Sequence, residues 1–131
     1  MEALQGQVGR RLRDDFNLLK SDYDVIICDC PPGISVMTES VLAASHLIIV
    51  PTIPDFMSTL GLDLFTGDIM QNLRDRDIES LPVVLATRYD DTPHQKVVLQ
   101  AMREAANSKE AEFEMFNTVI PLKSGFASNP I

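Results

Sequence analysis

The sequence has little of what several protein classes require. It contains no tryptophan and only 2 cysteines in 131 residues, so a disulfide scaffold is excluded and a reducing, cytoplasmic setting is expected. No uninterrupted apolar run approaches the roughly 18 residues that a membrane helix needs, and the polar N-terminus lacks the pattern of a signal peptide. We therefore expect a cytoplasmic protein that makes no membrane contact.

Positive charge is also scarce. Lysine and arginine together number 11 against 19 acidic residues, which gives a net charge of −8. Because affinity for phosphate backbones comes mainly from Lys and Arg, this chain alone is not expected to bind nucleic acid strongly. The apolar fraction of 45% excludes a disordered tail, and no linker, repeat or low-complexity tract divides the chain. Residues 1–131 are therefore predicted to form a single domain.

Four short apolar runs are present, at residues 25–28, 47–50, 83–86 and 116–120. The first three do not alternate with polar residues, as expected of strands that are covered on both faces. Segments with helical spacing of their apolar residues lie between the runs and before the first, where residues 4–19 form an amphipathic pattern. This alternation predicts an α/β fold, a parallel sheet with helices on both faces in three layers.

Ligands of open parallel sheets bind beyond the carboxyl ends of the strands. The residues that follow the four runs are rich in proline and glycine, and we expect these loops to meet at one rim of the sheet. Their candidate polar side chains are Asp29, Thr52, Asp55, Thr87, Arg88, Asp90 and Lys123.

Asp29 is the most informative of these residues, because it directly follows a buried apolar run. In P-loop nucleotide hydrolases an acidic residue at this position holds Mg²⁺ or its water shell. The glycine at position 33 allows a backbone N–H to approach an anion closely. Alternatively, Asp29 caps the helix that follows, as an aspartate at the end of a strand often does. The residues themselves leave both interpretations open.

Residues 23–33 read Tyr-Asp-Val-Ile-Ile-Cys-Asp-Cys-Pro-Pro-Gly, which closely resembles a conserved segment of the ParA/MinD family of deviant Walker ATPases. Three further elements resemble that family and occur in the same order: Ile-Ile-Val-Pro at 48–51, Thr-Arg-Tyr-Asp at 87–90 and Val-Ile-Pro at 119–121. The resemblance spans residues from about 22 to the C-terminus. The Pro-Pro variant is similar to the DNA- and cargo-partitioning ParA branch.

The resemblance implies a P-loop NTPase-like fold and a role for each matching position. Asp29 would be the catalytic Walker B residue that holds the water shell of Mg²⁺, and Pro32 and Gly33 would lie in the switch that senses the γ-phosphate. Residues near Thr87 and Pro121 would flank the adenine base, largely through backbone contacts. Arg88 would be either a contact to the ligand or a surface charge. In the family, Val-Ile-Pro is often followed by arginine, whereas this chain has Leu122 and Lys123.

The resemblance also implies cofactors and partners for the complete protein. It would use ATP and Mg²⁺, form an ATP-dependent homodimer, bind DNA non-specifically at the nucleoid and respond to a ParB-like adaptor. Its role would be the partitioning or positioning of a plasmid, a chromosome or a protein assembly.

The phosphate-binding P-loop is the feature that this sequence lacks. The motif G-x-x-x-x-G-K-[ST] requires a Gly-Lys dipeptide, and the 131 residues contain none. We therefore expect a C-terminal portion of a ParA-like ATPase domain that alone neither binds ATP normally nor hydrolyses it. The alternative is a non-catalytic interaction module of the same fold. Loss of the central P-loop strand would leave open sheet edges, which predicts a dimer or higher oligomer through exchanged elements.

The pair Cys28 and Cys30 is expected to be buried or half-buried rather than to bind a metal, since no histidine lies nearby in the sequence. The two histidines, His46 and His94, are expected to be structural or exposed.

Overall fold

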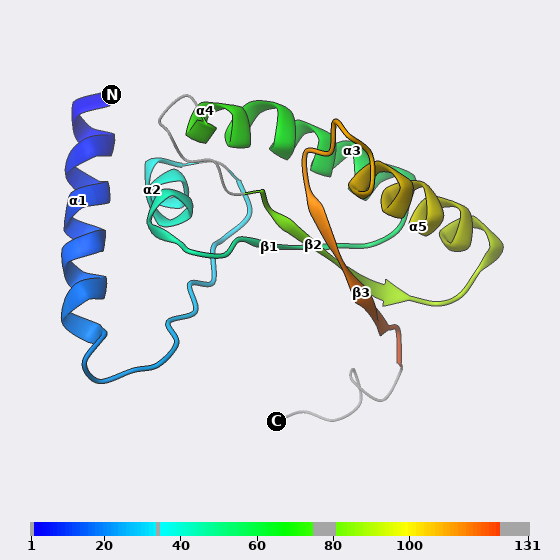
Figure 1. Cartoon of the computed structure of the whole chain (residues 1–131), viewed down its shortest axis with the longest axis horizontal. Helices are drawn as coiled ribbons and strands as arrows, with labels where there is room; N and C mark the ends of the chain where they lie inside the picture. The colour runs from blue at the N-terminus through cyan, green and yellow to red at the C-terminus, as the bar shows by residue number, and fades with distance from the viewer. Residues whose placement is uncertain (1, 34, 75–80, 124–131) are drawn as a thin grey trace.

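The computed structural model of the chain describes residues 2–33, 35–74 and 81–123 (Figure 1). Its elements, in chain order, are α1 (Glu2–Leu19), α2 (Val36–Ala44), β1 (Ile49–Thr52), α3 (Phe56–Leu64), a π-helical stretch η1 (Phe65–Met70), α4 (Gln71–Arg74), β2 (Val83–Tyr89), α5 (Pro93–Ala106) and β3 (Glu114–Pro121). Helices α3, η1 and α4 follow one another without a break and form one rod, which lies above the sheet in Figure 1.

The three strands form one parallel sheet in the order β1-β2-β3. Strands β1 and β2 pair in regular register from Ile49 with Val83 to Thr52 with Ala86. The pairing of β2 with β3 is irregular and ends at Tyr89 with Pro121. The predicted α/β class and parallel sheet are confirmed, and so are three of the four predicted strands.

The main core lies on one face of the sheet. Leu62 of α3, Val84 of β2, Met102 of α5 and Phe113 form one buried cluster, so both helices cover the face onto which Val84 projects. Burial of a large apolar side chain stabilises a fold by about 1.5–3 kcal/mol. These contacts fix the helical rod and α5 against β2, the central strand.

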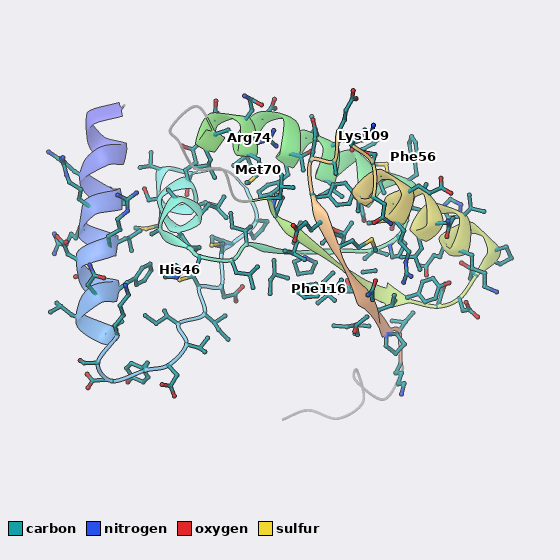
Figure 2. All side chains as sticks on the ribbon, in the orientation of Figure 1. His46, Phe56, Met70, Arg74, Lys109 and Phe116 are labelled. Carbon is teal, nitrogen blue, oxygen red and sulfur yellow. The ribbon has the colours of Figure 1, made fainter. Side chains whose placement is uncertain are left out.

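A second cluster joins α2 to the start of the sheet. Ile48, Met70 and Leu73 are buried together, and Leu42 of α2 packs against them. Figure 2 shows Met70 on the side of the rod that faces the sheet. Phe56, the first residue of the rod, is instead exposed to solvent. The predicted N-terminal helix is confirmed as α1, and it packs against α2 rather than against a strand.

Each of three helices begins at a polar residue that the local sequence specifies. Ser35 caps α2, Asp55 caps α3 and Thr92 caps α5, and in each case the side-chain oxygen accepts a hydrogen bond from the backbone N–H three residues later. Such caps satisfy one of the unpaired N–H groups of the first turn.

The prediction of a strand at residues 25–28 is wrong for this chain. The segment is irregular and all four of its residues are exposed, although Ile26 is only 38% exposed. Residues 24–33 form no backbone hydrogen bond with other backbone groups of the described residues. A strand requires a neighbour for its N–H and C=O groups, and the three strands of the sheet pair only with one another. Cys28 and Cys30 are consequently exposed, so the prediction that they are buried or half-buried is also wrong.

Candidate functional site

The carboxyl ends of β2 and β3 lie side by side and bring together three of the predicted site residues. Tyr89 pairs with Pro121 in the ladder, and the backbone N–H of Leu122 donates a hydrogen bond of 2.9 Å to the Tyr89 carbonyl. Thr87 is half-buried in β2, and Arg88 and Pro121 are exposed at the strand ends. Residues 87–90 and 119–122 therefore form one continuous rim, called the β2–β3 rim below.

The loop after β2 is held in a defined conformation by its own polar groups. Arg88 and Asp91 have φ angles of 52° and 62°, in a region that side-chain-bearing residues seldom adopt. The side chain of Gln95 accepts a hydrogen bond from the Asp90 N–H at 2.8 Å and donates one to the Arg88 carbonyl at 3.5 Å. Asp90 in turn accepts from the Thr92 N–H at 3.2 Å. The backbone at the β2–β3 rim is thus preorganised.

Tyr89 adds a neutral donor to this loop. Its hydroxyl donates to Asp91 Oδ1 at 2.9 Å, and Lys96 forms an exposed ion pair with the same oxygen at 3.6 Å. Partial burial of the ring, followed by the hydrogen bond and the negative charge of Asp91, raises the pKa of Tyr89. A tyrosine phenol is already protonated at neutral pH, and the raised pKa favours this donor form further.

Sequence reasoning overlooked Gln95 and Tyr89. A signal for Gln95 is present, because Thr92 and Gln95 have the spacing of a capping box at the start of α5. Thr92 Oγ1 accepts from the Gln95 N–H at 3.3 Å, which places the Gln95 side chain at the loop.

At the end of β1, Asp55 and Thr52 have local structural partners. Asp55 accepts a 2.7 Å hydrogen bond from the Ser58 N–H as the cap of α3. Hydrogen bonds from the backbone and hydroxyl of Ser58, with a smaller contribution from the charge of His94, lower the pKa of Asp55. Thr52 is buried, and its hydroxyl donates to the Val50 carbonyl at 3.2 Å.

Asp29 lies apart from the β2–β3 rim. Residues 23–33 run on the side of α2, whereas the arrowheads of β2 and β3 lie on the opposite side of the molecule (Figure 1). Asp29 is exposed and forms no hydrogen bond or ion pair with the described residues. The expectation that all four loops meet is wrong for this first loop, because its apolar run is not part of the sheet.

The interpretation of Asp29 as a helix cap is also excluded, since the cap of α2 is Ser35. Pro32 and Gly33 are exposed, and Gly33 has a φ of 101°, a backbone conformation that residues with a side chain rarely adopt. His46 and His94 are exposed, as expected. In the part of the chain that the structure describes, no group of three or more His, Cys, Asp or Glu side chains could hold a metal ion.

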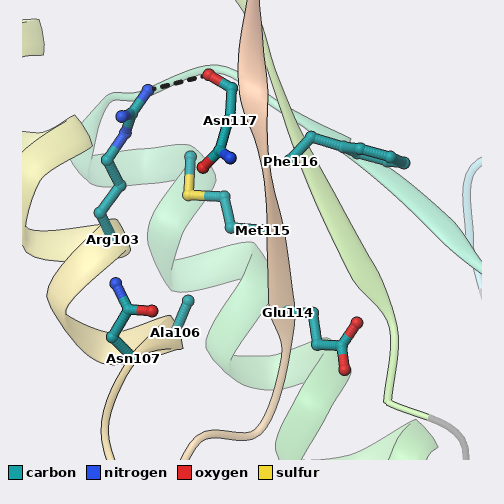
Figure 3. A pocket seen from close by; sticks show the side chains of 7 residues that line it. All are labelled: Arg103, Ala106, Asn107, Glu114, Met115, Phe116 and Asn117. Carbon is teal, nitrogen blue, oxygen red and sulfur yellow. Dashed lines mark hydrogen bonds between the residues drawn. The ribbon is translucent and has the colours of Figure 1, made fainter.

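Two shallow hollows flank the sheet. One, of about 350 Å³, lies between α5 and β3, where Arg103 Nη2 donates a hydrogen bond of 3.2 Å to the Asn117 carbonyl (Figure 3). The other, of about 370 Å³, lies between β1 and α3. Neither hollow is lined by a residue of the β2–β3 rim or of the segment 23–33. Among the described residues, no helix combines the length and the apolar character of a membrane span.

Comparison with known proteins identifies the family. A family model described as an AAA domain matches residues 2–81, which is more than half of the chain. The chromosome partitioning protein ParA of Myxococcus xanthus is 37% identical over 59 residues, which are 45% of this chain and 21% of that protein. The sporulation initiation inhibitor protein Soj of Bacillus subtilis is 29% identical over 113 residues, which are 85% of this chain and 43% of Soj.

A protein of Mycobacterium tuberculosis without an assigned function is 31% identical over 112 residues, covering 83% of this chain and 35% of its own length. The matched part of the chain thus spans less than half of the length of each of these curated relatives. The ordered motifs, the parallel α/β sheet and these matches agree with one another. The chain belongs to the ParA/MinD-like family of P-loop ATPases.

Proposed function

We propose that this chain is the C-terminal portion of a ParA-like ATPase domain, and that it supplies the base-binding side of a nucleotide site. The observation that carries the proposal is the β2–β3 rim, where the hydrogen bond from Leu122 to Tyr89 holds Thr87, Arg88 and Pro121 together. Its backbone is ordered by Gln95, so backbone groups are held in a fixed conformation from which they would contact the base. Adenine recognition through backbone groups requires such a fixed loop.

The residues present fit one part of an ATP–Mg²⁺ complex and not another. The carboxylate of Asp29 is exposed and unpartnered within the described residues, so it is free to bind the water shell of Mg²⁺. A cradle for the phosphates is not among the 131 residues, which contain no Gly-Lys dipeptide. When bound, ATP would supply the phosphoryl group whose transfer the complete site catalyses. This chain would contribute Asp29, Pro32 and Gly33 to that site only after the segment 23–33 is brought to the strand ends.

By the same proposal, the complete protein takes part in the partitioning or positioning of cargo in the cytoplasm. The names of its relatives support this role, since one is a chromosome partitioning protein and another is the cell division protein PomZ. Its partners would be a second copy, a ParB-like adaptor and, at the nucleoid, non-specific DNA. The net charge of −8 gives no support for a strong DNA-binding surface formed by this chain alone.

A biochemical experiment and a sequencing experiment test the proposal. The purified chain is expected to show no Mg²⁺-dependent ATP turnover, because binding energy for the phosphates is missing. Turnover that is abolished by Asp29→Asn would contradict this view. Reading the coding DNA upstream of Met1 is expected to reveal an in-frame P-loop sequence. If no such sequence exists, the result would favour the second candidate function, a non-catalytic interaction module.

That second candidate is a non-catalytic interaction module of the same fold. Two observations favour it: the absence of a Gly-Lys dipeptide and the exposure of the apolar segment 23–28. Both candidates predict the same fold, but only the ATPase portion predicts a P-loop upstream.

A further inference from the structure

The hollow between α5 and β3 is lined by two rows of side chains that local geometry brings face to face. Arg103, Ala106 and Asn107 are spaced three and one residues apart, so they share one face of the helix at its C-terminal end. Met115 and Asn117 are two residues apart and share one face of β3. Figure 3 shows these five side chains on the same side of the strand.

The charge on that side of the hollow is positive. Two charged residues line the hollow, Arg103 and Glu114. Because side chains alternate along a strand, Glu114 belongs to the other face of β3, and Figure 3 shows its carboxylate across the strand from Arg103. The guanidinium of Arg103 is therefore the charge that a ligand in the hollow would meet.

This guanidinium has more donors than partners. It carries five N–H groups, of which one on Nη2 donates to the Asn117 carbonyl at 3.2 Å. The Nε atom of Arg103 is buried and has no hydrogen-bond partner among the described residues. The same part of the chain provides no acceptor for Nη1. Acceptor oxygens in the hollow would thus meet donors that the chain itself leaves free.

Two primary amides complete the polar lining. The side chains of Asn107 and Asn117 are exposed and form no hydrogen bond within the described ranges. Each offers an acceptor oxygen and an NH₂ donor, which is the complement of the N–H and C=O of a peptide unit. Between them, the half-buried side chains of Ala106 and Met115 provide an apolar surface for methylene groups.

We propose that this hollow binds an acidic residue of a peptide, with the side-chain carboxylate on Arg103 and the adjoining peptide units on the two asparagine amides. A planar carboxylate accepts two parallel N–H groups of a guanidinium, which makes the pair directional as well as charged. The volume of about 350 Å³ lies within the range of about 300–1,000 Å³ for ligand sites. No residue that carries the proposal belongs to the β2–β3 rim, so it stands independently of the proposed function.

Titration with capped amino acids tests the proposal. The whole chain, labelled with ¹⁵N, is titrated to about 20 mM with acetyl-glutamate amide and, as the matched neutral ligand, with acetyl-glutamine amide. We expect the glutamate ligand to bind with a dissociation constant on the order of 1 mM and to shift the signals of Arg103 Nε–H and of both asparagine side-chain amides. The glutamine ligand should bind at least 10-fold more weakly. Equal binding of the two ligands, or no shift at Arg103, would overturn the proposal.

A pair of asparagine substitutions separates the hollow from general charge effects. Asn107→Asp places a negative charge one helical turn from Arg103 and is expected to weaken binding of the glutamate ligand at least 10-fold. Asn72 is a matched control, since it is also exposed near a helix end but lies on α4 and does not line the hollow. Asn72→Asp should change the affinity less than 2-fold. Equal effects of the two substitutions would overturn the proposal.

The planar geometry of the contact is tested by Arg103→Lys, which keeps the positive charge but removes the guanidinium fork. It is expected to weaken binding of the glutamate ligand at least 5-fold, and backbone amide signals outside the hollow show that the variant is folded. Unchanged affinity would overturn the role of the guanidinium.

Butyrate and inorganic phosphate distinguish the sources of negative charge. Butyrate has the carboxylate and methylene groups without the peptide units, and phosphate has the charge alone, so both are expected to bind at least 5-fold more weakly than acetyl-glutamate amide. Equal affinity of butyrate would overturn the assignment of a peptide ligand. Equal affinity of phosphate would overturn the assignment of a carboxylate.

Discussion

Residues 25–28 and 47–50 are two apolar runs of nearly the same composition, Val-Ile-Ile-Cys and Leu-Ile-Ile-Val, with different outcomes. The second run leads into β1, and its Ile48 is buried against Met70 and Leu73. The first is irregular and exposed. The difference lies in their neighbours, because β1 pairs with β2 whereas the first run has no strand to pair with in the described chain. An apolar run with strand propensity thus formed a strand only where a neighbouring strand could pair with it.

Hydrogen exchange should show the largest difference between these regions. At low micromolar concentration, the amides of 24–28 are expected to exchange at least about 1,000-fold faster than those of Val84 to Ala86, because central strand amides exchange only by opening of the core. Mass spectrometry of peptides from both regions measures this. Equal protection of residues 24–28 and of Val84 to Ala86 would contradict the expected difference in order between the two regions.

A pair of methionine substitutions extends the comparison to packing energies. Met70 is completely buried, whereas Met57 on the same rod is 73% exposed. Met70→Ala is expected to lower the free energy of unfolding by about 2–5 kcal/mol, since it removes a core side chain and leaves a cavity. Met57→Ala should change it by less than about 0.5 kcal/mol. Urea denaturation followed by circular dichroism gives both values. Similar losses of unfolding free energy in the two variants would show that Met70 is not a core residue.

Two of the three positive-φ positions among the described residues, Arg88 and Gly33, distinguish the ordered loop after β2 from the exposed segment 23–33. Arg88→Gly removes the cost of a side chain at φ 52° and is expected to stabilise the chain by up to about 1 kcal/mol, while Arg88→Ala stays within about 0.5 kcal/mol. Gly33→Ala introduces the opposite strain at φ 101°, but little packing depends on that turn. Its effect on the unfolding free energy should therefore be smaller than about 0.5 kcal/mol. A large loss with Gly33→Ala would show that the segment is coupled to the core.

The smallest expected effect concerns acid stability at Asp55. The pKa of Asp55 is lowered below its ordinary value of 3.8 by hydrogen bonds from Ser58, so its contribution to stability is present above that value. It is lost as the pH falls through the folded-state pKa. Asp55→Asn keeps a side-chain acceptor for the cap but does not titrate. The decline in urea midpoint from pH 6 to pH 2.5 should be slightly smaller in this variant than in the unmodified chain. A steeper decline in the variant would contradict the assignment.

Much of the fold was predictable because its signals are local. The β-branched runs at 47–50 and 83–86 and the helical spacing along α1, α3 and α5 identified the α/β class. Thr92 with Gln95 and Asp55 with Ser58 have the spacing of helix caps, and the structure contains both hydrogen bonds.

The candidate site was only partly predictable. Thr87, Arg88 and Pro121 meet because β2 and β3 pair in parallel, which places both carboxyl ends at one rim. Asp29 does not meet them, although its sequence context resembles that of the family as strongly as theirs does. A motif records the local sequence, whereas the position of Asp29 depends on whether its preceding run finds a partner strand.

The sequence alone determined the family, the sites of helix initiation and the lack of a phosphate-binding loop, since each depends on residues close together in the chain. Only the tertiary structure decided which apolar runs join the sheet, which cysteines are exposed and which site residues converge. Those outcomes depend on hydrogen bonds between strands far apart in the chain. Backbone donors and acceptors that find no such partner remain in water.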